Sequence, residues 1–206
     1  GDDAILIKKG RQRKIRTRKA TIKGFINKQV KYVKNKQLYK LIKLDELLLR
    51  NSIQLDIQKQ YHPDYIITDG APLINILAWG SVYRPELFTN RGIKDVVRYL
   101  TGKPIPMKKK LFYLKNAPEI AIICQLRIAL SKPKCVFFLK VSSKTAMHRI
   151  DKGRTKKQSH ENEQFLRKLQ EAYALVLECL NIKNTYSINA NKLSINGIVE
   201  KMRTKI

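Results

Sequence analysis

The chain has 206 residues, of which 43% are apolar, and this is enough for one domain with a real core. Its 43 Lys and Arg outnumber 16 Asp and Glu, so the formal net charge is +27, and we expect a polyanionic partner. No apolar run reaches the roughly 20 residues of a membrane-spanning helix, because Arg127 interrupts the longest candidate at residues 120–130. We therefore expect no membrane partner.

Positive charge is densest near the N-terminus, where residues 4–44 contain 15 Lys and Arg and no acid. Residues 4–8 could form a short strand, whereas residues 8–24 lack apolar periodicity and indicate a basic arm or loop. We expect this arm to contact nucleic acid, RNA rather than DNA, although a solubilising tail is the simpler interpretation. The cations expected to make the contact are Lys8, Lys9, Arg11, Arg13, Lys14, Arg16, Arg18 and Lys19.

Farther along, apolar spacing predicts a helix from Phe25 to Tyr61, which His62, Pro63 and Asp64 should end. A buried strand is then expected at residues 65–69. Residues 103–114 are interpreted as a Pro- and Lys-rich connection. Further helices are predicted before Gly102, over 117–130, from a Ser cap over 142–150, over 160–180 and around 198–202, with strands at 134–141 and 185–190. We expect a basic arm at residues 1–44 and one α/β domain at residues 45–206.

Buried strands that alternate with helices predict a parallel sheet with helices on both faces, a three-layer α/β fold. Ligands of open α/β sheets bind at the carboxyl ends of the strands, where Asp69 is expected. The basic loop at residues 151–158 could neutralise a phosphate there, and the carboxylate could hold Mg²⁺ or a sugar hydroxyl. The alternative for Asp69 is an acid that caps a turn at a strand end, and the alternative for the basic loop is a solvated surface loop.

Residues 45–206 resemble thymidylate kinases, within the nucleoside-monophosphate kinase family of P-loop kinases. The resemblance lies in the order of elements and in a few residues, and residues 185–202 are similar to the family's last strand and helix. It implies a P-loop-kinase-like fold in which Asp69 is the catalytic acid and Arg149, Lys152 and Arg154 form a phosphate-binding lid. The residues in matching order are Arg149, Ile150, Lys152, Gly153, Arg154, Glu161, Phe165 and Tyr173.

Two departures from this family change the expected function. Gly70 stands where the family usually has an arginine, and no G-x-x-x-x-G-K-[ST] loop occurs in these residues. Without the amides and lysine of that loop, ATP use should be lost. We expect a degenerate, non-catalytic domain without a cofactor that binds RNA in a larger assembly, such as a ribonucleoprotein with other proteins. The alternative is an active kinase that uses ATP and Mg²⁺ and whose phosphate loop lies upstream of Gly1.

The cysteines Cys124, Cys135 and Cys179 have apolar neighbours and are expected to be buried free thiols in a reducing compartment. This suits an intracellular protein of the cytoplasm or an organellar matrix. The three histidines show no ligand spacing to the cysteines, so no zinc site is expected. For Trp79, core packing is favoured over stacking on a base, and Tyr173 is expected in the core or on the face of its helix.

Overall fold

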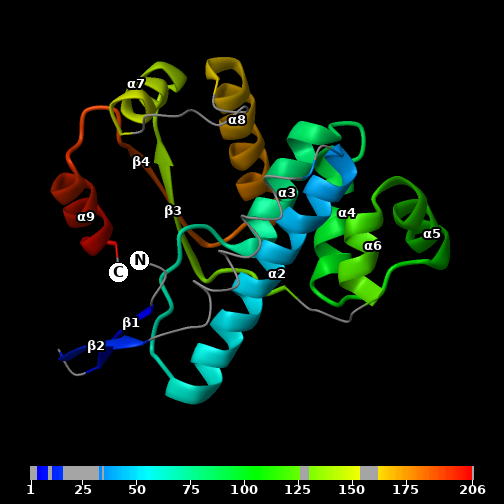
Figure 1. Cartoon of the computed structure of the whole chain (residues 1–206), viewed down its shortest axis with the longest axis horizontal. Coiled ribbons are helices and arrows are strands. Elements are labelled where there is room, and N and C mark those ends of the chain that lie inside the picture. The colour runs from blue at the N-terminus through cyan, green and yellow to red at the C-terminus, as the bar shows by residue number, and fades with distance from the viewer. Residues whose placement is uncertain are drawn as a thin grey trace. The chain divides into compact units, whose positions relative to one another are not determined.

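The computed structural model describes residues 4–8, 11–15, 33, 35–125, 130–153 and 162–205. Within these residues the chain is mixed α/β and mostly helical (Figure 1). Its contacts divide it into two compact units, unit 1 with residues 1–72 and 104–130 and unit 2 with residues 73–103 and 131–206.

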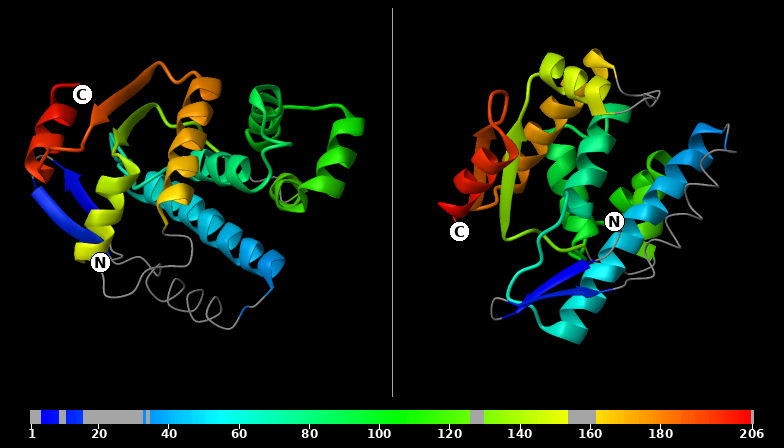
Figure 2. Two further views of the ribbon diagram at one scale, coloured as in Figure 1. Left: turned by 90° about the horizontal axis from the view of Figure 1, so that it is seen from above. Right: turned by 60° about the vertical axis from the view of Figure 1, so that its left-hand side comes forward.

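Unit 1 is built around α2 (Lys36–Tyr61), α5 (Met107–Asn116) and α6 (Pro118–Gln125). Helix α6 packs against both α5 and α2, and Figure 2 shows α5 and α6 as neighbouring helices. Apolar side chains fill this contact because they recur at helical spacing on α6 and the turn before it. The buried residues are Leu44, Tyr113, Ala117, Ile120, Ala121 and Ile123.

The end of α2 agrees with the sequence. The helix stops at Tyr61, and His62 takes the left-handed conformation with φ of 45°. Its amide still donates to the carbonyl of Gln58 at 3.1 Å, which satisfies one of the last helical carbonyls. The helix also passes through residues 44 and 45 without a break, and the expected division between arm and domain at that point stays a prediction.

An antiparallel hairpin completes the described part of unit 1. Strand β1 (Ala4–Lys8) pairs with β2 (Arg11–Ile15), and the register places Lys8 opposite Arg11 and Ala4 opposite Ile15. The strand predicted at residues 4–8 is confirmed. The interpretation of residues 11–15 as part of an arm or loop is wrong, because backbone pairing with β1 determines their conformation although their side chains are mostly basic.

Unit 2 contains a parallel pair, β3 (Cys135–Lys140) with β4 (Asn184–Asn189), in the register Cys135 to Asn184 through Lys140 to Asn189. The crossover between them consists of α7 (Ser143–Gly153) and α8 (Glu163–Leu180). Figure 1 shows α7 at the end toward which β3 points. These strands and both helices were predicted, which confirms the α/β crossover at this level.

The core of unit 2 lies among its helices. Helices α3 (Pro72–Tyr83), α4 (Asn90–Leu100) and α8 contribute most of the buried apolar side chains, and α9 (Ile195–Arg203) follows β4. Asn162 and Thr89 cap α8 and α4, because their side-chain oxygens accept from the amides of Phe165 and Gly92. The buried residues are Leu73, Ile74, Ile76, Leu77, Ala78, Ile93, Val96, Val97, Leu100, Ala172, Val176, Leu177 and Leu180.

Two predicted segments differ from the structure. Residues 65–69 form no strand, and Tyr65 and Ile67 are 76% and 85% exposed, so the expected buried strand before Asp69 is wrong. Residues 107–116 form helix α5 although they were interpreted as a connection. Within the described residues, the parallel sheet has two strands, β3 and β4. The finer expectation of a three-layer sheet stays a prediction.

A candidate nucleic-acid interface on helix α5

Helix α5 carries four lysines in ten residues. Lys108, Lys109 and Lys110 lie in its N-terminal part, and Lys115 lies in its last turn. Lys108, Lys110 and Lys115 are exposed, and Lys109 is half-buried. The first turn has no acidic residue, and Pro106 at the N-cap makes no side-chain hydrogen bond. We call these four lysines the α5 lysine cluster.

The position of Lys108, Lys109 and Lys110 is electrostatically unfavourable for an isolated helix. The amino end of a helix has a partial positive charge, which repels cations and attracts anions. Amides at such an end also bind phosphate readily. A phosphate beside the first turn of α5 would therefore meet the helix dipole and the lysine side chains together. The arrangement favours an anionic ligand over an empty surface.

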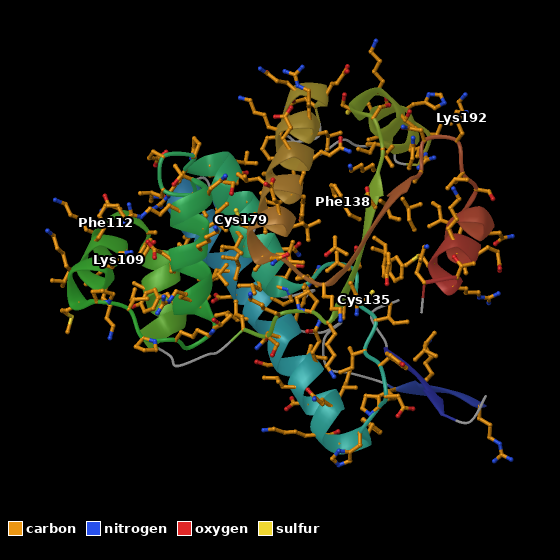
Figure 3. The ribbon with its side chains drawn as sticks, turned by 180° about the vertical axis from the view of Figure 1, so that it is seen from behind. Lys109, Phe112, Cys135, Phe138, Cys179 and Lys192 are labelled. Atoms are coloured by element: carbon orange, nitrogen blue, oxygen red, sulfur yellow. The ribbon has the colours of Figure 1, made fainter. Side chains whose placement is uncertain are left out.

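Phe112 adds an aromatic surface to this helix. It lies four residues after Lys108 and three before Lys115, spacings that place all three residues close together on the helix surface. Its side chain is 48% exposed, and Figure 3 shows it on α5 together with Lys109. Next to it, the buried Tyr113 anchors the helix, with the two ring centroids 5.6 Å apart. Cations with an exposed ring can hold a phosphate backbone and stack on an unpaired base.

Part of the predicted basic arm forms the hairpin of β1 and β2. Lys8, Arg11, Arg13 and Lys14 belong to its strands, and the described side chains of Arg11 and Lys14 are exposed. By contrast, the side chain of Ile15 is buried. The hairpin thus displays positive charge on an ordered backbone. The other predicted contacts lie outside the described residues, and these are Lys9, Arg16, Arg18 and Lys19.

The predicted lid has a structural contact at Arg149. Its Nη2 donates to the carbonyl oxygen of Ala190 at 2.8 Å and to that of Asn191 at 3.2 Å. The side chain of Asn191 in turn accepts from the amide of Ser142 at 2.7 Å. Arg149 therefore attaches α7 to the segment after β4, at the carboxyl end of the parallel pair. Its role in phosphate binding stays a prediction.

The remaining candidates of the kinase-like site belong to different segments of the chain. Lys152 is exposed in the last turn of α7, whereas Arg154 lies outside the described residues. Asp69 is exposed in a segment without helix or strand, next to Gly70 with φ of 76°. It belongs to the residues of unit 1, and Arg149 belongs to unit 2. A site that combines the expected acid with the lid stays a prediction.

Trp79 and Tyr173 are half-buried, and both contact other side chains of unit 2. The ring of Trp79 lies 5.6 Å from Phe165 and 5.8 Å from Tyr83, measured between centroids. The hydroxyl of Tyr173 donates to Oδ1 of Asn75 at 2.8 Å. This agrees with the packing interpretation of Trp79 and Tyr173, and it assigns Phe165 to the same cluster.

The cysteines differ from one another. Cys135 on β3 is exposed, so the expectation of burial is wrong for this residue. Cys179 on α8 is half-buried, and burial raises the pKa of its thiol, with Lys94 lowering it and Glu178 raising it to smaller extents. The side chain of Cys124 lies outside the described residues. In the part of the chain that the structure describes, no group of His, Cys, Asp and Glu could hold a metal ion.

Sequence reasoning missed α5 because prolines at positions 104 and 106 indicated a connection. The available signal was the spacing of Met107, Leu111 and Leu114, which recur along one side of a helix. A run of lysines beside Phe112 was the second signal. Pro106 itself fits a helix start, since proline is tolerated at the amino end of a helix.

Comparison of the chain with family models, with curated proteins and with solved structures gives no match. Among the helices that the structure describes, none has both the length and the apolar character needed to cross a bilayer.

Proposed function

We propose that this protein binds single-stranded RNA, with the α5 lysine cluster holding the sugar-phosphate backbone and Phe112 stacking on an unpaired base. The observation that carries the proposal is the placement of Lys108, Lys109 and Lys110 at the amino end of α5, beside an exposed aromatic ring. A phosphate relieves the repulsion between these lysines and the helix dipole, and the ring supplies contact area that does not depend on base identity.

The basic hairpin supplies a second set of phosphate contacts. Arg11 and Lys14 are exposed on β2, and the rest of the chain is also rich in bases. Positive charge of this extent raises the association rate and gives binding that depends steeply on salt. Unpaired RNA is preferred to a duplex, because Phe112 can reach the face of a base only when the base is unstacked. A ribonucleoprotein is the setting that this chemistry suits.

The proposal includes a degenerate thymidylate-kinase-like domain as the scaffold. The order β3, α7, α8, β4 and α9 in unit 2 supports the likeness, since the two strands are parallel and joined by helices. Asp69, exposed outside any strand, is poorly placed for a catalytic acid of a buried sheet. In this interpretation the fold has kept the crossover and has given up phosphoryl transfer.

The test uses the full chain and a fluorescent oligouridine of about 12 nucleotides, a length within the range that one small domain covers. Lys108→Gln, Lys109→Gln and Lys110→Gln are combined in one variant and titrated by anisotropy at several salt concentrations. Losing three phosphate contacts should flatten the slope of log K against log salt by about 2. Phe112→Ala alone should weaken binding by about 1–3 kcal/mol at unchanged slope.

The matched control removes the same charge elsewhere. Lys168, Lys192 and Lys201 are exposed residues of unit 2, and the triple change to Gln there should leave the slope nearly unchanged. Equal effects of the two triple variants would mean that binding follows net charge alone, and the proposed interface would then be rejected. Unfolding curves recorded for each variant separate lost contacts from lost structure.

A nucleotide kinase is the second candidate, and one observation favours it. Helices α7 and α9 both follow strands of the parallel pair and both begin at a serine cap, where Ser142 and Ser194 accept from amides at 3.2 Å. Such helix starts are where α/β proteins hold phosphates. The residue of unit 2 that the sequence resemblance would add is Lys152, as a contact to the phosphates of ATP. Transfer of labelled γ-phosphate from ATP to thymidine monophosphate by this chain would select this candidate.

A further inference from the structure

Strand β3 has the composition of a central strand but the position of an edge strand. In the described part of the chain it pairs with β4 and with no other strand. Its residues from Val136 to Leu139 are all apolar, whereas β4 carries Asn, Thr and Ser at most positions. Strands covered on both faces and both edges are continuous apolar runs, and edge strands are more polar. By composition, β4 suits an edge and β3 does not.

The exposure of β3 agrees with this comparison. Leu139 is 42% exposed, Cys135 is exposed, and Val136, Phe137 and Phe138 are only half-buried. Phe137 stacks on Tyr186 of β4 with 5.5 Å between ring centroids, so the two strands also pack through side chains on one face of the pair. Figure 3 shows Cys135 and Phe138 along the same strand. Because two-stranded sheets are marginally stable in water, a further strand would bury this apolar surface.

Lysines lie at both ends of β3. Lys134 precedes the strand and Lys140 ends it, and both are exposed. The ammonium of Lys140 lies 6.0 Å from the ring centroid of Phe138, close to the apolar surface. A segment that pairs with β3 would therefore meet an apolar centre between two positive ends. The complementary sequence is an apolar strand with acidic residues at both ends.

We propose that the free edge of β3 binds an extended apolar segment of a partner protein, flanked by acidic residues, as an additional β-strand. Backbone hydrogen bonds to the open edge give the affinity, and the side chains on both faces of β3 give the selectivity for apolar residues. A second copy of this chain is a poor partner, since its own β3 carries the same lysines and each copy has a net charge of +27.

The test uses the full chain and a fluorescent synthetic peptide with alternating Val and Ile between pairs of Glu. We expect saturable binding, slower hydrogen exchange of the amides at residues 135–140, and slower reaction of Cys135 with a maleimide. A control peptide has the same side chains but is methylated on every amide nitrogen between the Glu pairs. It keeps the charge and loses the hydrogen-bond donors on both of its edges, so it should bind roughly tenfold more weakly or worse.

Variants test the charge complementarity. Lys134→Glu with Lys140→Glu should weaken binding of the acidic peptide roughly tenfold, whereas Lys168→Glu with Lys201→Glu should change it little. Equal binding of the methylated peptide, unchanged exchange at residues 135–140, or no saturable binding at about 1 mM peptide would each overturn the proposal. The peptide comparisons need no variant, so they decide the question even if a substitution unfolds the chain.

Discussion

The hydroxyl of Tyr173 donates a hydrogen bond of 2.8 Å to Oδ1 of Asn75, and this bond joins α8 to α3 within unit 2. The pair is partly buried, so the amide oxygen of Asn75 would have poor access to water without the hydroxyl. We expect Tyr173→Phe to lower the free energy of unfolding by about 1 kcal/mol. Urea denaturation followed by circular dichroism measures the change.

Tyr186→Phe is the matched control for this prediction. The ring of Tyr186 stacks on Phe137, and the substitution keeps that contact. We expect the free energy of unfolding to change far less for this variant than for Tyr173→Phe. A change of the same size in both variants would show that the hydrogen bond between Tyr173 and Asn75 adds nothing specific to the free energy of unfolding.

Gly80 allows Phe88 to approach the backbone of α3. A Cβ atom at Gly80 would lie 2.3 Å from Cζ of Phe88, whose side chain is almost completely buried. Gly80→Ala must therefore displace the ring, and overpacking of this kind costs about 1–3 kcal/mol. Thermal unfolding should show a lower midpoint for this variant.

The same substitution at Gly197 provides the comparison. There a Cβ would lie 3.5 Å from Oγ of Ser194, an ordinary contact, and alanine favours the helix over glycine. Gly197→Ala should keep or raise the midpoint. If Gly80→Ala also left the midpoint unchanged, the ring of Phe88 could move away at no cost, which would contradict its close packing against Gly80.

Neighbouring residues were sufficient to predict the secondary structure of a segment where its sequence pattern agreed with its environment in the fold. The end of α2 followed from His62 and Pro63, since neither continues a helix easily in that position. The continuous apolar run of β3 and the serine before α7 likewise marked a strand and a helix start. These features depend on a few neighbouring residues, so sequence reasoning finds them.

The errors arose where long-range contacts determine the conformation. Residues 65–69 have high strand propensity, yet a strand requires a partner, and no strand in the described residues pairs with them. Residues 11–15 lack that propensity, yet they are a strand because β1 lies opposite. The expected position of Asp69 at the edge of a sheet was wrong for the same reason, because it depended on a strand at residues 65–69.

The candidate interface could be predicted only in part. The charge excess indicated a polyanionic partner, but charge alone does not distinguish the N-terminal arm from α5. The assignment of α5 required the structure, in which residues 107–116 form a helix and Tyr113 is buried on one side of it. Only then do Phe112 and Lys108 lie close together on the exposed side.

Cys135 and Cys179 should differ in reactivity. Cys135 is exposed on β3, whereas burial raises the pKa of the Cys179 thiol, so less of the Cys179 side chain is thiolate at mildly alkaline pH. Because the thiolate is the nucleophile, a maleimide should modify Cys135 first. Mass spectrometry of digested samples taken over time measures both rates. Faster modification of Cys179 in the folded chain would contradict the burial.

The raised pKa also predicts a pH dependence of stability. The folded chain holds the Cys179 proton more tightly than the unfolded chain does. This contribution is fully present below the thiol's ordinary pKa, and it is lost as the pH rises through the raised pKa. The difference in unfolding free energy between the unmodified chain and Cys179→Ser should therefore decrease toward alkaline pH. A difference that stays constant across that range would contradict the prediction.

The α5 lysine cluster predicts opposite effects of one substitution on stability and on RNA binding. Lys108 lies near the amino end of α5, where the helix dipole disfavours a cation and favours an anion. Lys108→Glu should therefore stabilise unit 1 by about 0.5 kcal/mol and should weaken binding of oligouridine. Urea denaturation and anisotropy titration measure the two effects on the same preparation.

Lys115→Glu makes the same change of charge at the other end of the helix. A cation is favoured near the carboxyl end, so this variant should lose stability by a similar amount while it also weakens RNA binding. The two variants thus share the sign of their effect on binding and differ in the sign of their effect on stability. High salt should reduce both stability effects, because exposed charges near helix ends are screened. If Lys108→Glu destabilised the chain and left RNA binding unchanged, the lysines at the start of α5 would serve the fold, and the interface proposed for them would have to be abandoned.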